Sequence, residues 1–267
     1  MKITRCRTAN DQIVYASIDA DGTASVLEGD LASGFRATER RVGVSQRLAP
    51  LEPRQVIGIG LNYKRHAAES GMTPPGYPVV FHKTLNSVQG PDGPIVLPRG
   101  GRCQKTDYEC ELAIVIGRDC KDATPNRALE YVFGYTCAND VSSREWQLER
   151  GGGQWSYGKS FDTFCPLGPV LVTRDEIPDP NALRISTKLN GKLVQDWRTD
   201  DMIFNVRELI AFLSANTTLL AGTVILTGTP HGVGMAHDPP RWLRPGDEVI
   251  VAVEGIGELR NVVVEGE

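Results

Sequence analysis

The chain has 267 residues, of which 40% are hydrophobic and 23% are charged, a composition typical of a soluble globular protein with a substantial core. Its formal net charge of -4 does not favour nucleic acid or an anionic membrane as a partner. No stretch approaches the roughly 18 apolar residues of a membrane helix, and residues 1–6 lack the apolar run of a secretory signal. We therefore expect a cytoplasmic protein, although loss of a transit peptide would be consistent with the mitochondrial matrix.

The cysteines and histidines do not form a common zinc or redox motif. The six cysteines include no C-x-x-C pair, and the four histidines include no H-E-x-x-H motif. A long chain without a secretory signal usually keeps its cysteines as free thiols. If the protein binds a metal ion, we expect oxygen atoms as its ligands.

The first segment of the chain predicts a β-hairpin. Residues 12–18 and 23–27 alternate between apolar and polar side chains, as strands do. The intervening residues 19–22 end in glycine, which is typical of a tight turn. A polar, basic stretch follows the hairpin.

Two prolines mark a boundary after this unit. Pro50 and Pro53 are close together, and proline lacks the backbone N–H that helices and sheets require. The sequence therefore predicts a small N-terminal β unit over residues 1–50 and a main domain over residues 51–267.

Short apolar runs predict strands throughout the main domain. They lie at residues 55–60, 79–81, 95–97, 112–116, 170–172, 185–189, 223–226, 248–253 and 258–264. Helices are predicted over residues 62–70, 144–149 and 206–215. Because strands outnumber helices and do not alternate regularly with them, this pattern predicts a β-rich α+β domain and not a doubly wound sheet.

A group of acidic residues precedes one of the predicted buried strands. Glu109 and Glu111 are two residues apart, so the period of a strand places both side chains on one face. Cys110 would lie on the other face. Burying two like charges together is unfavourable, and a hard divalent cation such as Mg²⁺, Mn²⁺ or Ca²⁺ removes that repulsion. The alternative is an exposed strand edge with solvated glutamates, against which the apolar run at residues 112–116 argues.

Asp140 offers a third carboxylate at the end of another apolar segment. It would complete a set of ligands that leaves positions for water and substrate, or it would cap the helix that follows. Arg144 and Gln147 are three residues apart in that helix and would share a face. Asp107 is expected to help shape the strand beside the glutamates.

Two further charged groups have both a functional and an ordinary interpretation. His66 and Glu69 are three residues apart on a predicted helix, where a carboxylate would orient the imidazole as a general base. The alternative is a surface pair. Lys159 follows the glycine-rich residues 151–153, which are typical of a mobile loop over an active site. The alternative for Lys159 is a solvated charge.

Glycine-rich stretches suggest two other kinds of site. Gly58 and Gly60 follow a strand, but the third glycine of a dinucleotide-binding motif is missing and Tyr63 stands near its place. Residues 227–234, which include Thr229, form a glycine-rich turn that could present backbone N–H groups and a hydroxyl to an anion. The alternative is a tight turn without a ligand.

Taken together, these segments resemble the fumarylacetoacetate hydrolase superfamily, in order, over about residues 55–264. The matching segments are residues 60–63 with His66 and Glu69, residues 81–83, residues 107–112, residues 139–141 with Arg144 and Gln147, residues 158–162, and residues 227–230. Residues 158–171 are most similar to the branch of fumarylacetoacetate hydrolase domain-containing proteins.

The resemblance implies a mixed β-roll around a central metal site, usually in a homodimer. It implies that Mg²⁺ or Mn²⁺, with Ca²⁺ as a substitute in a crystal, is bound by Glu109, Glu111 and Asp140. It further implies a catalytic His66–Glu69 dyad. Lys159 matches the active-site lysine of the family.

The expected activity is hydrolytic cleavage of a carbon–carbon bond in a β-diketo or 2-keto acid of the acylpyruvate type. The metal ion would stabilise the enolate that leaves. His66 would activate the attacking water, and Lys159 would stabilise developing negative charge. Arg144, Gln147 and Thr229 are expected to contact the substrate.

Two other functions are consistent with the same residues. The site could tautomerise or decarboxylate oxaloacetate, since both reactions need enolate stabilisation without hydrolytic attack. The chain could also be a non-catalytic, metal-stabilised binding protein that shares the fold.

Overall fold

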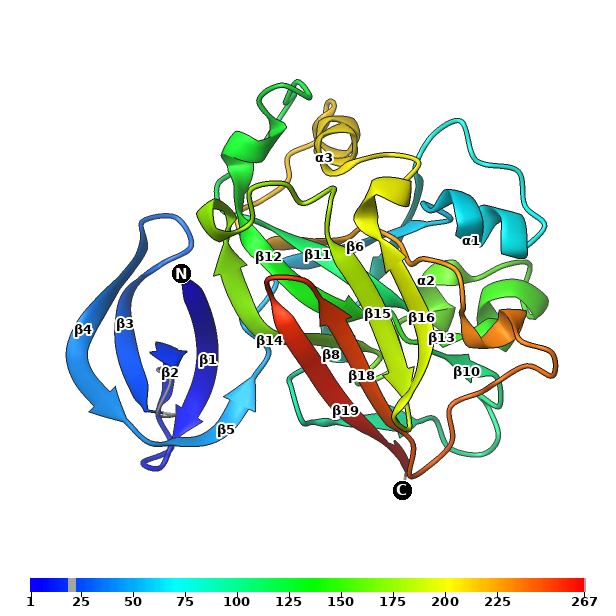
Figure 1. Ribbon diagram of the computed structural model, residues 1–267, viewed down its shortest axis with the longest axis horizontal. Coiled ribbons are helices and arrows are strands. Elements are labelled where there is room, and N and C mark those ends of the chain that lie inside the picture. Colours follow the sequence, from blue (N-terminus) through cyan, green and yellow to red (C-terminus); the bar gives the residue numbers. More distant parts are fainter. Residues whose placement is uncertain (19–22, 267) are drawn as a thin grey trace.

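The computed structural model describes residues 1–18 and 23–266 and is rich in β-strands (Figure 1). Its α-helices in these ranges are α1 (Lys64–Glu69), α2 (Trp155–Gly158) and α3 (Val206–Ser214). A short π-helical turn covers Glu145–Glu149, and two-residue strands β10 (Thr106–Asp107) and β13 (Ser142–Ser143) pair with each other. The β-rich α+β class predicted from the sequence is confirmed.

The remaining strands form two larger sheets. One has 12 strands, with a main path in the order β4 (Gly34–Val42), β3 (Ala24–Asp30), β2 (Ile13–Ile18), β1 (Lys2–Thr8), β14 (Cys165–Thr173), β12 (Val132–Asn139), β11 (Cys110–Ile116), β17 (Thr223–Leu226), β6 (Gln55–Gly60) and β7 (Val79–Lys83). Beside this path, β5 (Val44–Leu48) pairs with β1 and β8 (Val88–Gln89) pairs with β14. The other has 5 strands in the order β16 (Lys192–Arg198), β15 (Arg184–Leu189), β18 (Glu248–Val253), β19 (Gly257–Glu265) and β9 (Pro94–Leu97).

Strand β11 lies at the centre of the main domain and is buried along its whole length. Leu112 and Ile114 pack into the core that also contains Ile185 and Val251 of the smaller sheet. The alternate residue Ala113 packs into a second core on the opposite face. Both faces of the strand are therefore covered, which explains why its sequence is continuously apolar.

The N-terminal strands β1 to β5 lie to one side of the main domain (Figure 1). They join it through β1, which pairs with β14 at Lys2↔Val172 and Ile3↔Leu171. The predicted strands of the hairpin pair as β2 and β3, while its turn at residues 19–22 lies outside the described residues. The division of the chain at residue 50 stays a prediction.

Several elements differ from the sequence-based expectation. The basic stretch after the hairpin forms β4 and β5, and β16 was also not expected, because these strands carry many exposed polar side chains. Residues 144–149 form the π-helical turn in place of an α-helix. No helix in the described ranges is long and apolar enough to cross a membrane.

Candidate active site

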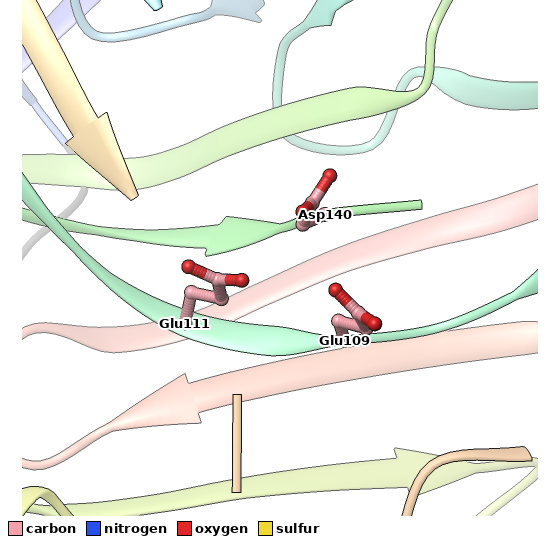
Figure 2. A group of neighbouring side chains, drawn as sticks. All are labelled: Glu109, Glu111 and Asp140. Atoms are coloured by element: carbon pink, nitrogen blue, oxygen red, sulfur yellow. The ribbon is translucent and has the colours of Figure 1, made fainter. Parts of the chain in front are cut away.

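Three buried carboxylates meet where strands β11 and β12 lie side by side. One oxygen each from Glu109, Glu111 and Asp140 lies within 4.8 Å of the others. Figure 2 shows Glu109 and Glu111 along one strand and Asp140 on its neighbour. The antiparallel pairing explains this arrangement, because the Asp140 N–H donates to the Glu109 carbonyl oxygen at 2.9 Å. Asp140 therefore acts as a strand-end residue and not as the cap of the following helix, which begins only at Glu145.

Two buried lysines hold these carboxylates. The Lys159 ammonium lies 2.7 Å from Glu109 Oε2, 2.6 Å from Asp140 Oδ2 and 2.7 Å from Ser142 Oγ. The Lys83 ammonium lies 2.5 Å from Asp140 Oδ1. Lys159 is therefore not a solvated charge, and its three N–H bonds all have partners.

Arg144 is the third cation of this group. Its Nε donates to Asp107 Oδ2 at 2.9 Å, and its Nη1 donates to Gln147 Oε1 at 2.7 Å. Nη1 also lies 2.8 Å from Glu109 Oε1. Asp107 fixes this guanidinium and also accepts from the backbone N–H of Gly234 at 2.6 Å. It therefore does more than shape its strand.

The buried carboxylates differ in the charge that surrounds them. Burial raises the pKa of Glu109, but the nearby Lys159 and Arg144 charges outweigh it and hold that pKa below its ordinary value. Burial, Asp140 and Glu109 together raise the pKa of Glu111 well above its ordinary value. Glu111 accepts from the Gly228 N–H at 2.6 Å and forms no ion pair with the described residues.

The arrangement fits a hard divalent cation. The donors are carboxylate oxygens, which Mg²⁺ and Mn²⁺ prefer. Among the described residues Glu111 has no ion-pair partner, and a bound cation would favour its charged form and balance that charge. Glu109, Glu111 and Asp140 are the residues that would hold it.

His66 and Glu69 form a pair beside the carboxylates. His66 Nδ1 lies 2.8 Å from Glu69 Oε1 on helix α1, and His66 is only 8% exposed, so a freely solvated surface pair is excluded. Glu69 also accepts from the Gly232 N–H at 2.9 Å. This second contact ties α1 to the glycine-rich turn. The other imidazole nitrogen, Nε2, is the one that the Glu69 contact leaves for a reactant.

The glycine-rich turn at residues 227–234 binds anions of the protein itself. The N–H groups of Gly228, Gly232 and Gly234 donate to three carboxylates, those of Glu111, Glu69 and Asp107 respectively. These N–H groups therefore donate to carboxylates of the protein and are not available to a substrate. In the same turn, Thr229 Oγ1 accepts from Gln195 Nε2 at 2.9 Å.

One pocket is lined by the predicted residues of the site except for Glu69 and the more enclosed Asp140. It is lined by Ile59, Gly60, Leu61, His66, Ser70, Met72, Glu109, Glu111, Arg144, Gln147, Leu148, Trp155, Lys159, Thr229 and Met235. Glu69 does not line the pocket, but its carboxylate is paired with His66 Nδ1. The structure therefore brings the predicted catalytic, substrate-binding and metal-binding side chains into one place.

Gly58 and Gly60 make room for aromatic rings and not for a dinucleotide. A Cβ on Gly58 would lie 2.1 Å from the Phe81 ring, and one on Gly60 would lie 2.2 Å from the Trp155 ring. The two rings themselves are in contact, with centroids 5.9 Å apart. Trp155 opens helix α2, which leads directly to Lys159. The glycines thus position one wall of the pocket.

Sequence reasoning did not assign a role to Lys83 or Gln195, and it expected Asp107 only to help shape its strand. Lys83 contacts Asp140, Asp107 anchors Arg144, and Gln195 holds Thr229. Gln195 also accepts from the Cys110 N–H at 3.0 Å, so it fixes the strand between the two glutamates. Neither the pattern of β7 around Lys83 nor that of β16 gives a local sign of these contacts.

The family model for the C-terminal part of fumarylacetoacetate (FAA) hydrolase matches residues 55–264. The chain belongs to this family. A Burkholderia lata protein named provisionally as a hydrolase is 49% identical over 261 residues, which cover 90% of this chain and 91% of that protein.

Solved structures of this family are similar over the whole chain. A 5-carboxymethyl-2-hydroxymuconate delta-isomerase from Mycobacterium smegmatis is 38% identical, with a TM-score of 0.87 and 100% of both chains covered. A fumarylacetoacetate hydrolase from Exiguobacterium antarcticum is 35% identical, with a TM-score of 0.85 and 100% of both chains covered. The fold is thus one that hydrolases and isomerases share.

Proposed function

We propose that this protein is a Mg²⁺- or Mn²⁺-dependent hydrolase that cleaves a carbon–carbon bond in a β-diketo or 2-keto acid of the acylpyruvate type. The observation that carries the proposal is one pocket that contains both the buried glutamates and His66, with Glu69 behind the imidazole. Family membership supports it, because hydrolases of this fold are among the similar proteins.

Glu109, Glu111 and Asp140 would hold the metal ion. When bound, a divalent cation would supply Lewis acidity, which favours negative charge on the substrate oxygens. Lys159 and Lys83 keep the carboxylates in place through their ion pairs. Gln147 and Thr229 line the same pocket and would orient the substrate.

His66 would act as the general base. Its Nε2 would take a proton from a water molecule, which adds to the carbonyl carbon distal to the pyruvyl group. The bond between that carbon and the adjacent methylene then breaks, and its electron pair leaves with the pyruvyl fragment as an enolate. Return of the proton to the former methylene carbon of the enolate gives pyruvate, and the distal carbon leaves in a carboxylic acid. Glu69 orients the His66 imidazole through its contact with Nδ1.

A second candidate function is tautomerisation or decarboxylation of oxaloacetate at the same site. Its support is the similarity to a solved isomerase, 38% identical over the full chain. Both reactions need the buried carboxylates that would hold the metal ion and a side chain that carries a proton, but neither needs attack by water.

Incubation of the Mg²⁺-loaded protein with acetylpyruvate and, separately, with enol-oxaloacetate tests the proposal. Release of pyruvate and acetate from acetylpyruvate is the expected result. Rapid ketonisation of enol-oxaloacetate, or its conversion to pyruvate and CO₂, without acetylpyruvate cleavage would favour the second candidate. Absence of turnover with a wider panel of 2-keto acids and with Mn²⁺ would favour a non-catalytic binding protein.

A further inference from the structure

The pocket that contains the buried glutamates also has an apolar wall. Leu61, Met72, Leu148, Trp155 and Met235 belong to this wall. They come from separate segments of the chain, including the π-helical turn for Leu148 and helix α2 for Trp155. The Trp155 ring is fixed, because it packs against Gly60 on one side and Phe81 on another.

The basic side chains that line this pocket have little capacity for a further carboxylate. Among the described residues they are His66, Arg144 and Lys159. Each N–H bond of the Lys159 ammonium already has an oxygen partner within 2.7 Å. Arg144 lies between Asp107, Glu109 and Gln147. His66 Nδ1 is paired with Glu69, and its Nε2 is the nitrogen that the proposed function assigns to the attacking water.

The charges of the buried ionic side chains also disfavour a second substrate carboxylate. Three cations, Lys83, Lys159 and Arg144, contact the carboxylates of Asp107, Glu109 and Asp140, while Glu111 is a fourth carboxylate without an ion pair among the described residues. With a divalent cation bound and Glu111 ionised as its ligand, this group would carry one net positive charge. A single substrate carboxylate would then neutralise it. A second carboxylate against the apolar wall would have no further cationic partner among the residues that line the pocket, which is costly.

We propose that the site selects 2-keto acids whose distal group is uncharged and apolar, and that Leu148, Met72 and Trp155 exclude substrates with a carboxylate at that end. This inference rests on the proposed function, since it assumes that a 2-keto acid binds with its carboxylate toward the metal ligands. It narrows the substrate class from keto acids in general to monocarboxylic ones.

Binding of two matched ligands tests the selection independently of turnover. 2-Oxopentanoate and 2-oxoglutarate have five carbons and the same 2-oxo acid end, and they differ in a methyl or a carboxylate at the other end. Neither has the second carbonyl that hydrolysis requires. Titration calorimetry with the Mg²⁺-loaded protein should show binding of 2-oxopentanoate at least about tenfold tighter than that of 2-oxoglutarate.

A substitution in the wall should remove most of the selection. Leu148 is 39% exposed, so a longer charged side chain at this position keeps access to water and the fold should tolerate it. Leu148→Arg should improve 2-oxoglutarate binding about tenfold. The matched control Leu148→Met keeps an apolar wall of similar volume and should retain the native preference.

The outcomes separate the two proposals. Equal or tighter binding of 2-oxoglutarate by the native protein would overturn the selection and leave the proposed hydrolase intact. An unchanged ratio of affinities in Leu148→Arg would show that this wall does not set the selection. If neither ligand binds to the Mg²⁺-loaded protein, the keto-acid function itself fails, and the inference fails with it.

Discussion

Lys159 illustrates how one residue can hold a site together. Its ammonium is buried against Glu109 and Asp140, which would otherwise face each other as two like charges. Removal of one partner from a buried ion pair typically costs about 3–5 kcal/mol, because the remaining charge has no compensation. The stability of the protein should therefore depend on this side chain more strongly when no divalent cation is present.

Lys159→Met is expected to lower the melting temperature in the presence of a chelator and to increase the rise in that temperature on addition of Mg²⁺. The larger rise is expected because a bound cation replaces the lost positive charge. Thermal unfolding with and without Mg²⁺ measures both effects. Lys105→Met is the control, since Lys105 pairs with Glu149 on the surface and should matter little. An equal Mg²⁺-dependent rise in native protein and Lys159→Met would contradict this view of the site.

His66→Ala is expected to lower kcat for the proposed hydrolysis by about 100-fold or more, because general-base catalysis contributes roughly that much. Magnesium affinity should stay close to that of the native protein, since His66 is not among the three carboxylates of the candidate metal site. Steady-state kinetics and a Mg²⁺ titration measure the two quantities. Unchanged kcat in a correctly folded variant would exclude His66 as the base.

Local patterns in the sequence identified some residues of the site and missed others. The two-residue spacing of Glu109 and Glu111 indicated a shared face, and the close approach of their oxygens agrees with it. Lys83 and Gln195 could not be found in this way. Lys83 meets Asp140 across 57 positions of the chain, and such a contact depends on strand pairing that no local pattern encodes. The family resemblance supplied the roles of His66 and Lys159, which spacing alone left open.

At the scale of elements, the end of strand β6 controls the position of helix α2. Gly60→Ala would bring a methyl group within 2.2 Å of the present Trp155 ring. The ring would have to move, and α2 and Lys159 follow it directly in the chain. We expect a clear loss of kcat or of ligand affinity.

Gly76→Ala is the matched control for this substitution, because a Cβ there meets no atom within 4 Å. Kinetic constants of both variants, together with near-ultraviolet circular dichroism of the tryptophans, provide the measurement. The positioning role of Gly60 is wrong if Gly60→Ala behaves like Gly76→Ala.

Buried elements were easier to predict than exposed ones. Strand β11 is apolar along its length because both of its faces are covered, so its sequence indicates a strand clearly. Strand β16 pairs with β15 at the edge of its sheet and carries mostly polar or half-buried side chains. Hydrophobic periodicity is weak in such a strand. The same reason explains why the sequence over β4 and β5 indicates only a polar, basic stretch.

At the scale of the whole molecule, the N-terminal strands share a sheet and a core with the main domain. Ile3 of β1 is fully buried in the same cluster as Leu171 and Leu226. Ile3→Ala is expected to destabilise the entire protein by about 2–5 kcal/mol, the usual cost of such a truncation in a core. Because the cluster spans both parts, unfolding should remain a single transition at a lower denaturant concentration.

Chemical denaturation followed by circular dichroism and by tryptophan fluorescence tests this expectation. All four tryptophans lie in the main domain, so fluorescence reports on that part alone. If Ile3→Ala shifted the circular dichroism transition but left the fluorescence transition unchanged, the N-terminal unit would unfold independently.

The lysine and arginine contacts of the buried carboxylates bear on the order of assembly. Because Lys83, Lys159 and Arg144 neutralise most of the negative charge, the chain can complete its fold before it meets a metal ion. Small zinc domains behave differently, since their ligands come together only around the metal. In this protein the ion would bind to a site that is already formed in the folded chain, and its release would not unfold the chain. The fraction of active molecules would then follow the free divalent-cation concentration around the protein, while the amount of folded protein stays constant.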